Sequence, residues 1–155
     1  MPATLSPKHL YLMAVLLPAA LAPHPASAAL GEVETTVASD AERLEGSIKS
    51  TERTNYRVHE IKLPSGSVVR EFATLDGHVF AVAWRGPTIP NLQQVLGSYF
   101  DTFTAAARMP HGGHHQLQIH QDNFVMRSSG HMRAFSGRAY LPPAVPAGVS
   151  LDELR

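Results

Sequence analysis

The sequence predicts an α+β domain, in which an antiparallel sheet of about six strands carries one long amphipathic helix and a short N-terminal helix. Two observations lead to this prediction. Apolar and polar residues alternate in short runs separated by turn residues, as in strands. Between two groups of such runs, residues 91–107 switch to a helical period. The order of the periods therefore indicates a meander, a helix and further strands.

The first group of runs predicts a three-stranded meander. These runs cover residues 55–63, 67–75 and 78–84 and are rich in β-branched and aromatic residues. Asp76 and Gly77, a common hairpin turn, separate the second run from the third. Connections this short allow only antiparallel neighbours.

Two helices are predicted around this meander. The apolar residues of 91–107 fall on one stripe, and Asn91 can cap the first turn, so we expect this helix to cover one face of the sheet. A Ser-x-x-Glu pattern at Ser39 predicts a shorter helix over 40–48.

Alternation returns after the long helix. Two further strands are expected over 116–120 and 124–128, and Ser129 and Gly130 are expected to turn the chain into a last strand-like stretch. Within that stretch we expect a β-bulge at Gly137. A proline-rich tail ends the chain.

The N-terminal segment predicts export. Lys8 precedes an apolar run that leads to an Ala-Ser-Ala site ending at Ala28, the pattern of a cleaved secretory signal peptide. The run is shorter than a membrane span and contains prolines. We therefore expect residues 1–28 to be removed after export by the general secretory route. This leaves a single domain at 29–155, without a membrane anchor, in the periplasm or outside the cell.

The composition of the chain argues against several classes of function. The chain has 13 Lys and Arg against 13 Asp and Glu, and this balance argues against a nucleic-acid partner. It has no cysteine, which excludes disulfides and a thiol nucleophile. It also lacks the Gly-x-Ser-x-Gly, Ser-x-x-Lys and His-Glu-x-x-His motifs and a phosphate-binding glycine loop. No catalytic residue is therefore assigned.

A histidine-rich segment between 111 and 120 is a candidate metal site. Imidazole is the commonest side-chain ligand for zinc or copper, and an exported protein meets both metals. The candidate ligands are His111, His114, His115 and His120. The alternative is a polar loop that binds no metal, since no carboxylate lies close by and two glycines raise the cost of ordering.

Arginines near the C-terminus form a candidate anion-binding site. Arg133 and Arg138 would point to opposite faces of a regular strand, but the bulge expected at Gly137 would bring them to one face. Together with His131 or Arg85 they could then bind a carboxylate, a phosphate or an acidic peptide. The alternative is that acidic side chains pair with these arginines and fix the strand register. The candidate acids are Glu60, Glu71 and Asp101.

These observations favour a non-enzymatic binding or accessory module whose partner is an exported protein or an anionic ligand, with no cofactor. The alternative is a metal-handling or hydrolase-like protein centred on residues 111–120.

Three segments, VFAVAWRGP (79–87), NLQQVLGSYF (91–100) and GHMRAFSGRAYLP (130–142), carry a resemblance to a known family. Together they resemble the proteobacterial family catalogued as domain of unknown function 2844, whose members are small exported proteins. The resemblance covers the chain from about Leu30 onward. It implies export and the same order of meander, helix and strands, and it carries over no activity and no residue role.

Overall fold

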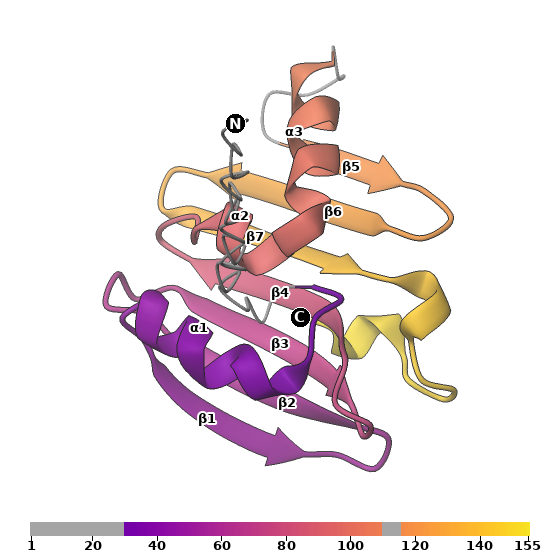
Figure 1. Cartoon of the computed structure of the whole chain (residues 1–155). Coiled ribbons are helices and arrows are strands. Elements are labelled where there is room, and N and C mark those ends of the chain that lie inside the picture. Colours follow the sequence, from indigo (N-terminus) through magenta and orange to yellow (C-terminus); the bar gives the residue numbers. More distant parts are fainter. Residues whose placement is uncertain (1–29, 110–115) are drawn as a thin grey trace, which may run out of the picture.

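The computed structural model describes residues 30–109 and 116–155 (Figure 1). Over these two ranges it confirms an α+β fold built on an antiparallel sheet, with seven strands in the order β1-β2-β3-β4-β7-β6-β5 rather than about six. The strands are β1 (Ser47–Glu52), β2 (Tyr56–Lys62), β3 (Val68–Thr74), β4 (Val79–Gly86), β5 (Gln116–His120), β6 (Val125–His131) and β7 (Ala134–Tyr140). The helical segments are η1 (Glu34–Thr36), α1 (Val37–Arg43), α2 (Leu92–Leu96), η2 (Gly97–Tyr99), α3 (Phe100–Arg108), η3 (Pro142–Ala144) and η4 (Leu151–Glu153).

The predicted meander corresponds to β2, β3 and β4. Its central position explains the apolar run in β4, because residues 79–84 are buried on both faces of the sheet. On its other side β4 pairs with β7, so the long connection through the helices and β5–β6 returns to the middle of the sheet.

Strand β1 corrects the prediction of a helix over 40–48. Helix α1 ends at Arg43, and Ser39 lies inside it rather than at its cap. Glu45 has a φ of 53°, a left-handed conformation that ends the helix. All six residues of β1 are exposed at the sheet edge. A strand that buries neither face has no apolar alternation, so the sequence gives no signal for it.

The predicted helix over 91–107 is broken at Gly97, where α2 meets η2. Gly97 has a φ of 53°, which glycine adopts more readily than other residues. Asn91 caps α2 as expected, because its side chain accepts a 3.3 Å hydrogen bond from the Gln94 amide. Leu96 is fully buried, so the apolar stripe does cover the sheet despite the break.

The glycines of β6 and β7 were expected in a turn and a bulge, and neither expectation is correct. Gly130 lies within β6, and the chain turns at Met132 and Arg133 instead. Gly137 pairs in continuous register with both neighbouring strands, so there is no bulge. Each glycine makes room for an aromatic ring. An added Cβ would lie 2.4 Å from Phe135 Cδ1 at Gly130 and 2.1 Å from Trp84 Cζ2 at Gly137.

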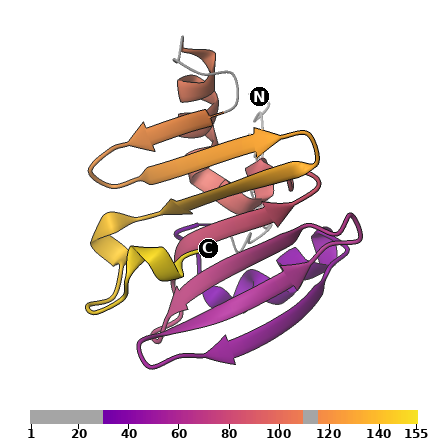
Figure 2. The same ribbon diagram turned by 180° about the vertical axis from the view of Figure 1, so that it is seen from behind.

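The sheet is covered on both faces. Helices α1 to α3 lie on one face, here named the helix face, and the tail segment (residues 141–155) lies on the other, the tail face (Figures 1 and 2). On the tail face Leu154 is fully buried in a cluster with Tyr56, Phe72 and Phe80. Among residues 30–109 and 116–155, none of the helices has the length and apolar character that a membrane crossing requires.

Candidate functional site

Arg85 and Arg138 lie on the tail face of neighbouring strands. Arg85 pairs with Ser136, and Ala83 pairs with Arg138. Alternate residues of a strand share a face, so both arginines project from the same side without any bulge. The bulge predicted at Gly137 concerned Arg133 and Arg138, and none is needed to bring Arg85 and Arg138 to one face.

The register of the next strands extends this arrangement into two rows. The rows cross strands β5, β6, β7 and β4 in that order, and all their side chains lie on the tail face. The first row is Gln116, Ser129, Ser136 and Arg85, and the second is Gln118, Arg127, Arg138 and Ala83. Apart from Ala83, every residue in both rows is polar or charged.

These rows form the floor of a groove of about 410 Å³, here named the arginine groove. Leu154 and Arg155 of the tail segment line one side of it. The tail is held against the floor because Arg138 donates a 2.6 Å hydrogen bond to the main-chain oxygen of Leu151. Figure 2 shows this segment lying beside β7 and β4.

The groove is strongly cationic. Among the described residues, four arginines line it, Arg85, Arg127, Arg138 and Arg155, and no Asp or Glu side chain does. Arg127 and Arg138 are direct cross-strand partners, which places their Cβ atoms about 5 Å apart. Like charges at this separation destabilise a sheet. An anion bound between them would remove this repulsion.

The acids that were expected to neutralise these arginines lie elsewhere. Both Nε and Nη2 of Arg70 lie 2.9 Å from Glu60 Oε2. Glu71 is buried on the opposite face of the sheet, and Asp101 lies in α3 over that same face. Within the described ranges, no carboxylate lies within 4 Å of the guanidinium of Arg138.

The other two predicted anion-binding residues are not in the groove. His131 ends β6, and Arg133 follows in the turn to β7 with a φ of 61°. Ala134, which follows that turn, is four residues from Arg138, a separation of about 13 Å along the strand. The structure therefore replaces His131 and Arg133 with Arg127 and Arg155, which the sequence analysis did not identify.

Most of the predicted metal site lies outside the described residues, namely His111, His114 and His115. His120 is exposed at the end of β5 and lines a separate hollow with Tyr140 and Leu151. In the part of the chain that the structure describes, no three His, Asp or Glu residues are grouped as metal ligands.

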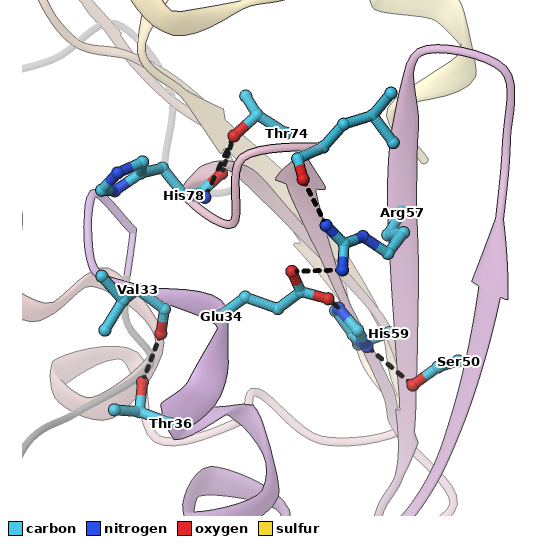
Figure 3. A network of polar contacts seen from close by, with 9 residues as sticks. Val33, Glu34, Thr36, Ser50, Arg57, His59, Thr74 and His78 are labelled. Carbon is cyan, nitrogen blue, oxygen red and sulfur yellow. Dashed lines mark hydrogen bonds and ion pairs between the residues drawn. The ribbon is translucent and has the colours of Figure 1, made fainter.

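A second polar cluster lies on the helix face, and sequence analysis did not identify it (Figure 3). The Ser50 hydroxyl lies 2.7 Å from His59 Nδ1, and Glu34 Oε1 lies 2.8 Å from His59 Nε2. The other carboxylate oxygen of Glu34 lies 3.0 Å from Arg57 Nη1. Arg57 also donates a 2.6 Å hydrogen bond to the Leu75 carbonyl. The cluster joins η1 to the strands β1 and β2, so no local motif could reveal it.

A buried carboxyl group lies next to this cluster. Glu71 is the cross-strand partner of His59 and is only 1% exposed, and neither of its carboxyl oxygens has a hydrogen-bond partner in the described part of the chain. Burial, with a smaller contribution from the negative charge of Asp40, raises the pKa of Glu71 to about 9. Glu71 is therefore a neutral acid at pH 7.

Comparison with known proteins places the chain in a family. Residues 26–154 match the family model described as protein of unknown function (DUF2844). No curated protein matches the chain, and no solved structure does. The match covers most of the chain, including every described strand and helix, and so the chain belongs to the DUF2844 family.

Proposed function

We propose that the protein is an exported binding module whose arginine groove holds an anionic ligand without reacting with it. The ligand carries carboxylate or phosphate groups, either free or on an acidic segment of a partner protein. The observation that carries the proposal is the direct cross-strand placement of Arg127 and Arg138 without an acidic neighbour in the groove.

The chemistry of the groove supports binding of an anion. Guanidinium groups bind carboxylates and phosphates through paired hydrogen bonds. The Ser129 and Ser136 hydroxyls, 3.1 Å apart, and the amides of Gln116 and Gln118 add neutral donors along the same floor. The floor of the groove crosses four strands, which suits an extended ligand.

The same residues give little support to catalysis in the groove. Ser129 and Ser136, two of its three serines, have only each other as hydrogen-bonding side-chain partners among the residues described. Without a neighbouring base a serine hydroxyl is a weak nucleophile. The metal-handling alternative depends on histidines that lie mostly outside the described residues.

Export is part of the proposal. The signal-peptide pattern of residues 1–28 supports it, and places the protein in the periplasm or outside the cell. Sequencing the N-terminus of the protein recovered from its native cells tests this step, because cleavage by signal peptidase would make Ala29 the first residue.

Calorimetric titration with hexaglutamate and with inorganic phosphate tests the groove. We expect hexaglutamate to bind, and Arg127→Gln and Arg138→Gln each to weaken binding by at least about tenfold, since a hydrogen bond to a charged group contributes about 1.5–3 kcal/mol. Arg133→Gln, at the hairpin end, is the matched control and should bind normally. Equal losses in all three variants, or no binding of either anion at millimolar concentration, would contradict the proposal.

A further inference from the structure

Ser50, His59 and Glu34 have the connectivity of a nucleophile, a base and an orienting acid. The Ser50 hydroxyl lies within hydrogen-bond distance of one ring nitrogen of His59, at 2.7 Å. A Glu34 carboxylate oxygen lies 2.8 Å from the other ring nitrogen. Serine hydrolases on unrelated folds share this order of residues, which is recognised by geometry rather than by sequence position, although there the serine faces Nε2 and the acid faces Nδ1.

The surroundings hold His59 in place and put a negative charge beside it. Glu34 is held in place by Arg57 at 3.0 Å, and the His59 side chain is only 7% exposed. Glu34 Oε1 approaches Nε2 without the geometry of a hydrogen bond, and Nε2 has no other hydrogen-bond partner among the described residues. Nδ1 faces the Ser50 hydroxyl and is the ring nitrogen that can accept its proton.

Ser50 is accessible, unlike His59. It lies on the edge strand β1, all of whose residues are exposed. Hydrogen-bonded and non-bonded pairs alternate along an antiparallel ladder. The Arg53 amide donates to the Tyr56 carbonyl, so these two residues form a hydrogen-bonded pair. Ser50 lies three residues earlier in β1, and it therefore faces His59 in a pair without backbone hydrogen bonds. The Ser50 amide N–H therefore points to the open edge, where it can donate to a carbonyl oxygen that approaches the hydroxyl.

We propose that Ser50 is a reactive nucleophile that accepts the acyl group of carboxylic esters presented at the β1 edge. Ser50 Oγ attacks the ester carbonyl carbon, and its proton moves to His59 Nδ1. The bond from that carbon to the alcohol oxygen breaks, and His59 returns the proton to the leaving alkoxide. Water then cleaves the acyl-serine by the same transfers, releasing the carboxylic acid and restoring Ser50.

This site lies on the helix face, whereas the arginine groove lies on the tail face. The inference therefore does not depend on the proposed anion binding. Glu34 acts through His59 and is a positioning residue. It does not touch the substrate.

Reaction with p-nitrophenyl acetate tests the proposal. We expect release of p-nitrophenolate, with acetyl found on Ser50 by peptide mass spectrometry. Ser50→Ala should abolish that acetylation, and Ser47→Ala, a change of the same kind on the same strand, should leave it intact. His59→Gln should slow release by about 10²-fold or more, the usual contribution of a general base.

Glu34→Gln keeps the size of the side chain but removes the negative charge that faces His59 Nε2. We expect it to slow acetylation of Ser50 at least tenfold, with an unchanged circular dichroism spectrum. This variant keeps the test decisive if His59→Gln does not fold. The proposal is overturned if wild-type Ser50 is not acetylated, if Ser47 reacts equally, or if folded Glu34→Gln reacts at the wild-type rate.

Discussion

Glu71 makes the stability of the fold depend on pH in a way that a single substitution can isolate. Its carboxyl group is buried on the helix face of β3, between His59 of β2 and Val82 of β4, and residues 30–109 and 116–155 offer it no hydrogen-bond partner. Burial and the nearby Asp40 raise its pKa from 4.5 to about 9. The substitution Glu71→Gln keeps the shape of the neutral acid and removes the ionisable proton.

The direction of the pH effect on the free energy of unfolding follows from whether Glu71 is protonated in the folded chain, in the unfolded chain, or in both. Below pH 4.5, Glu71 is protonated in both the folded and the unfolded chain and adds no pH dependence. Between about pH 4.5 and 9 it is protonated only in the folded chain, so raising the pH favours unfolding. Each pH unit in this window lowers the free energy of unfolding by about 1.4 kcal/mol. Between pH 5 and pH 8 the loss is at most about 4 kcal/mol, since an ionised Glu71 can draw water into the site.

Urea unfolding of the wild type and of Glu71→Gln at pH 5, 6, 7 and 8 measures this effect. Subtracting one free energy of unfolding from the other cancels the contributions of the groups that do not interact with Glu71. We expect the difference to change by several kcal/mol in favour of the variant as the pH rises. Glu42→Gln, a change at an exposed position of α1, should show no such trend. A difference that stays constant from pH 5 to pH 8 would refute the reasoning.

Two further predictions concern packing on the two faces of the sheet. Gly137→Ala places a Cβ 2.1 Å from the Trp84 ring, and we expect it to lower the free energy of unfolding by about 1–3 kcal/mol, the usual cost of overpacking; an unchanged melting temperature would contradict this contact. Leu154→Ala empties a fully buried position under the tail segment, and we expect a loss of about 2–5 kcal/mol in urea unfolding. A loss below 1 kcal/mol would indicate that the tail is not packed as described.

The sequence predicts the positions of the strands that bury apolar side chains. It does not predict an exposed strand, or a glycine that is required by a ring from another strand. Strands β2 to β4 show alternation and clear turn residues, so their positions follow from local signals. Edge strand β1 buries nothing and gives no signal. The glycines at 130 and 137 were misread, because the usual meanings of glycine are a turn or a bulge. Here glycine leaves room for an aromatic ring, that of Phe135 at Gly130 and that of Trp84 at Gly137, and only the folded sheet brings these rings near.

The candidate sites also could not be predicted in full from the sequence, because they depend on contacts between distant residues. Arg127 faces Arg138 because the β6–β7 hairpin turns at Met132 and Arg133. That dipeptide is not a favoured turn sequence, so the register could not be read from the residues. Arg155 reaches the groove only because the tail segment folds back over the sheet. The Ser50, His59 and Glu34 contacts likewise join residues that are brought together by strand pairing and by the docking of η1.

The arginine groove and the tail segment depend on one another. Leu154 anchors the tail in the aromatic cluster of the tail face, and Arg70 donates a hydrogen bond to the main-chain oxygen of Arg155. Arg138 uses one nitrogen of its guanidinium to hold the Leu151 carbonyl. A guanidinium has five N–H donors, so Arg138 can hold the tail and still present donors to an anion in the groove. An anion that binds Arg138 and Arg155 together would therefore stabilise the docked tail, because it binds a surface that exists only when the tail is in place.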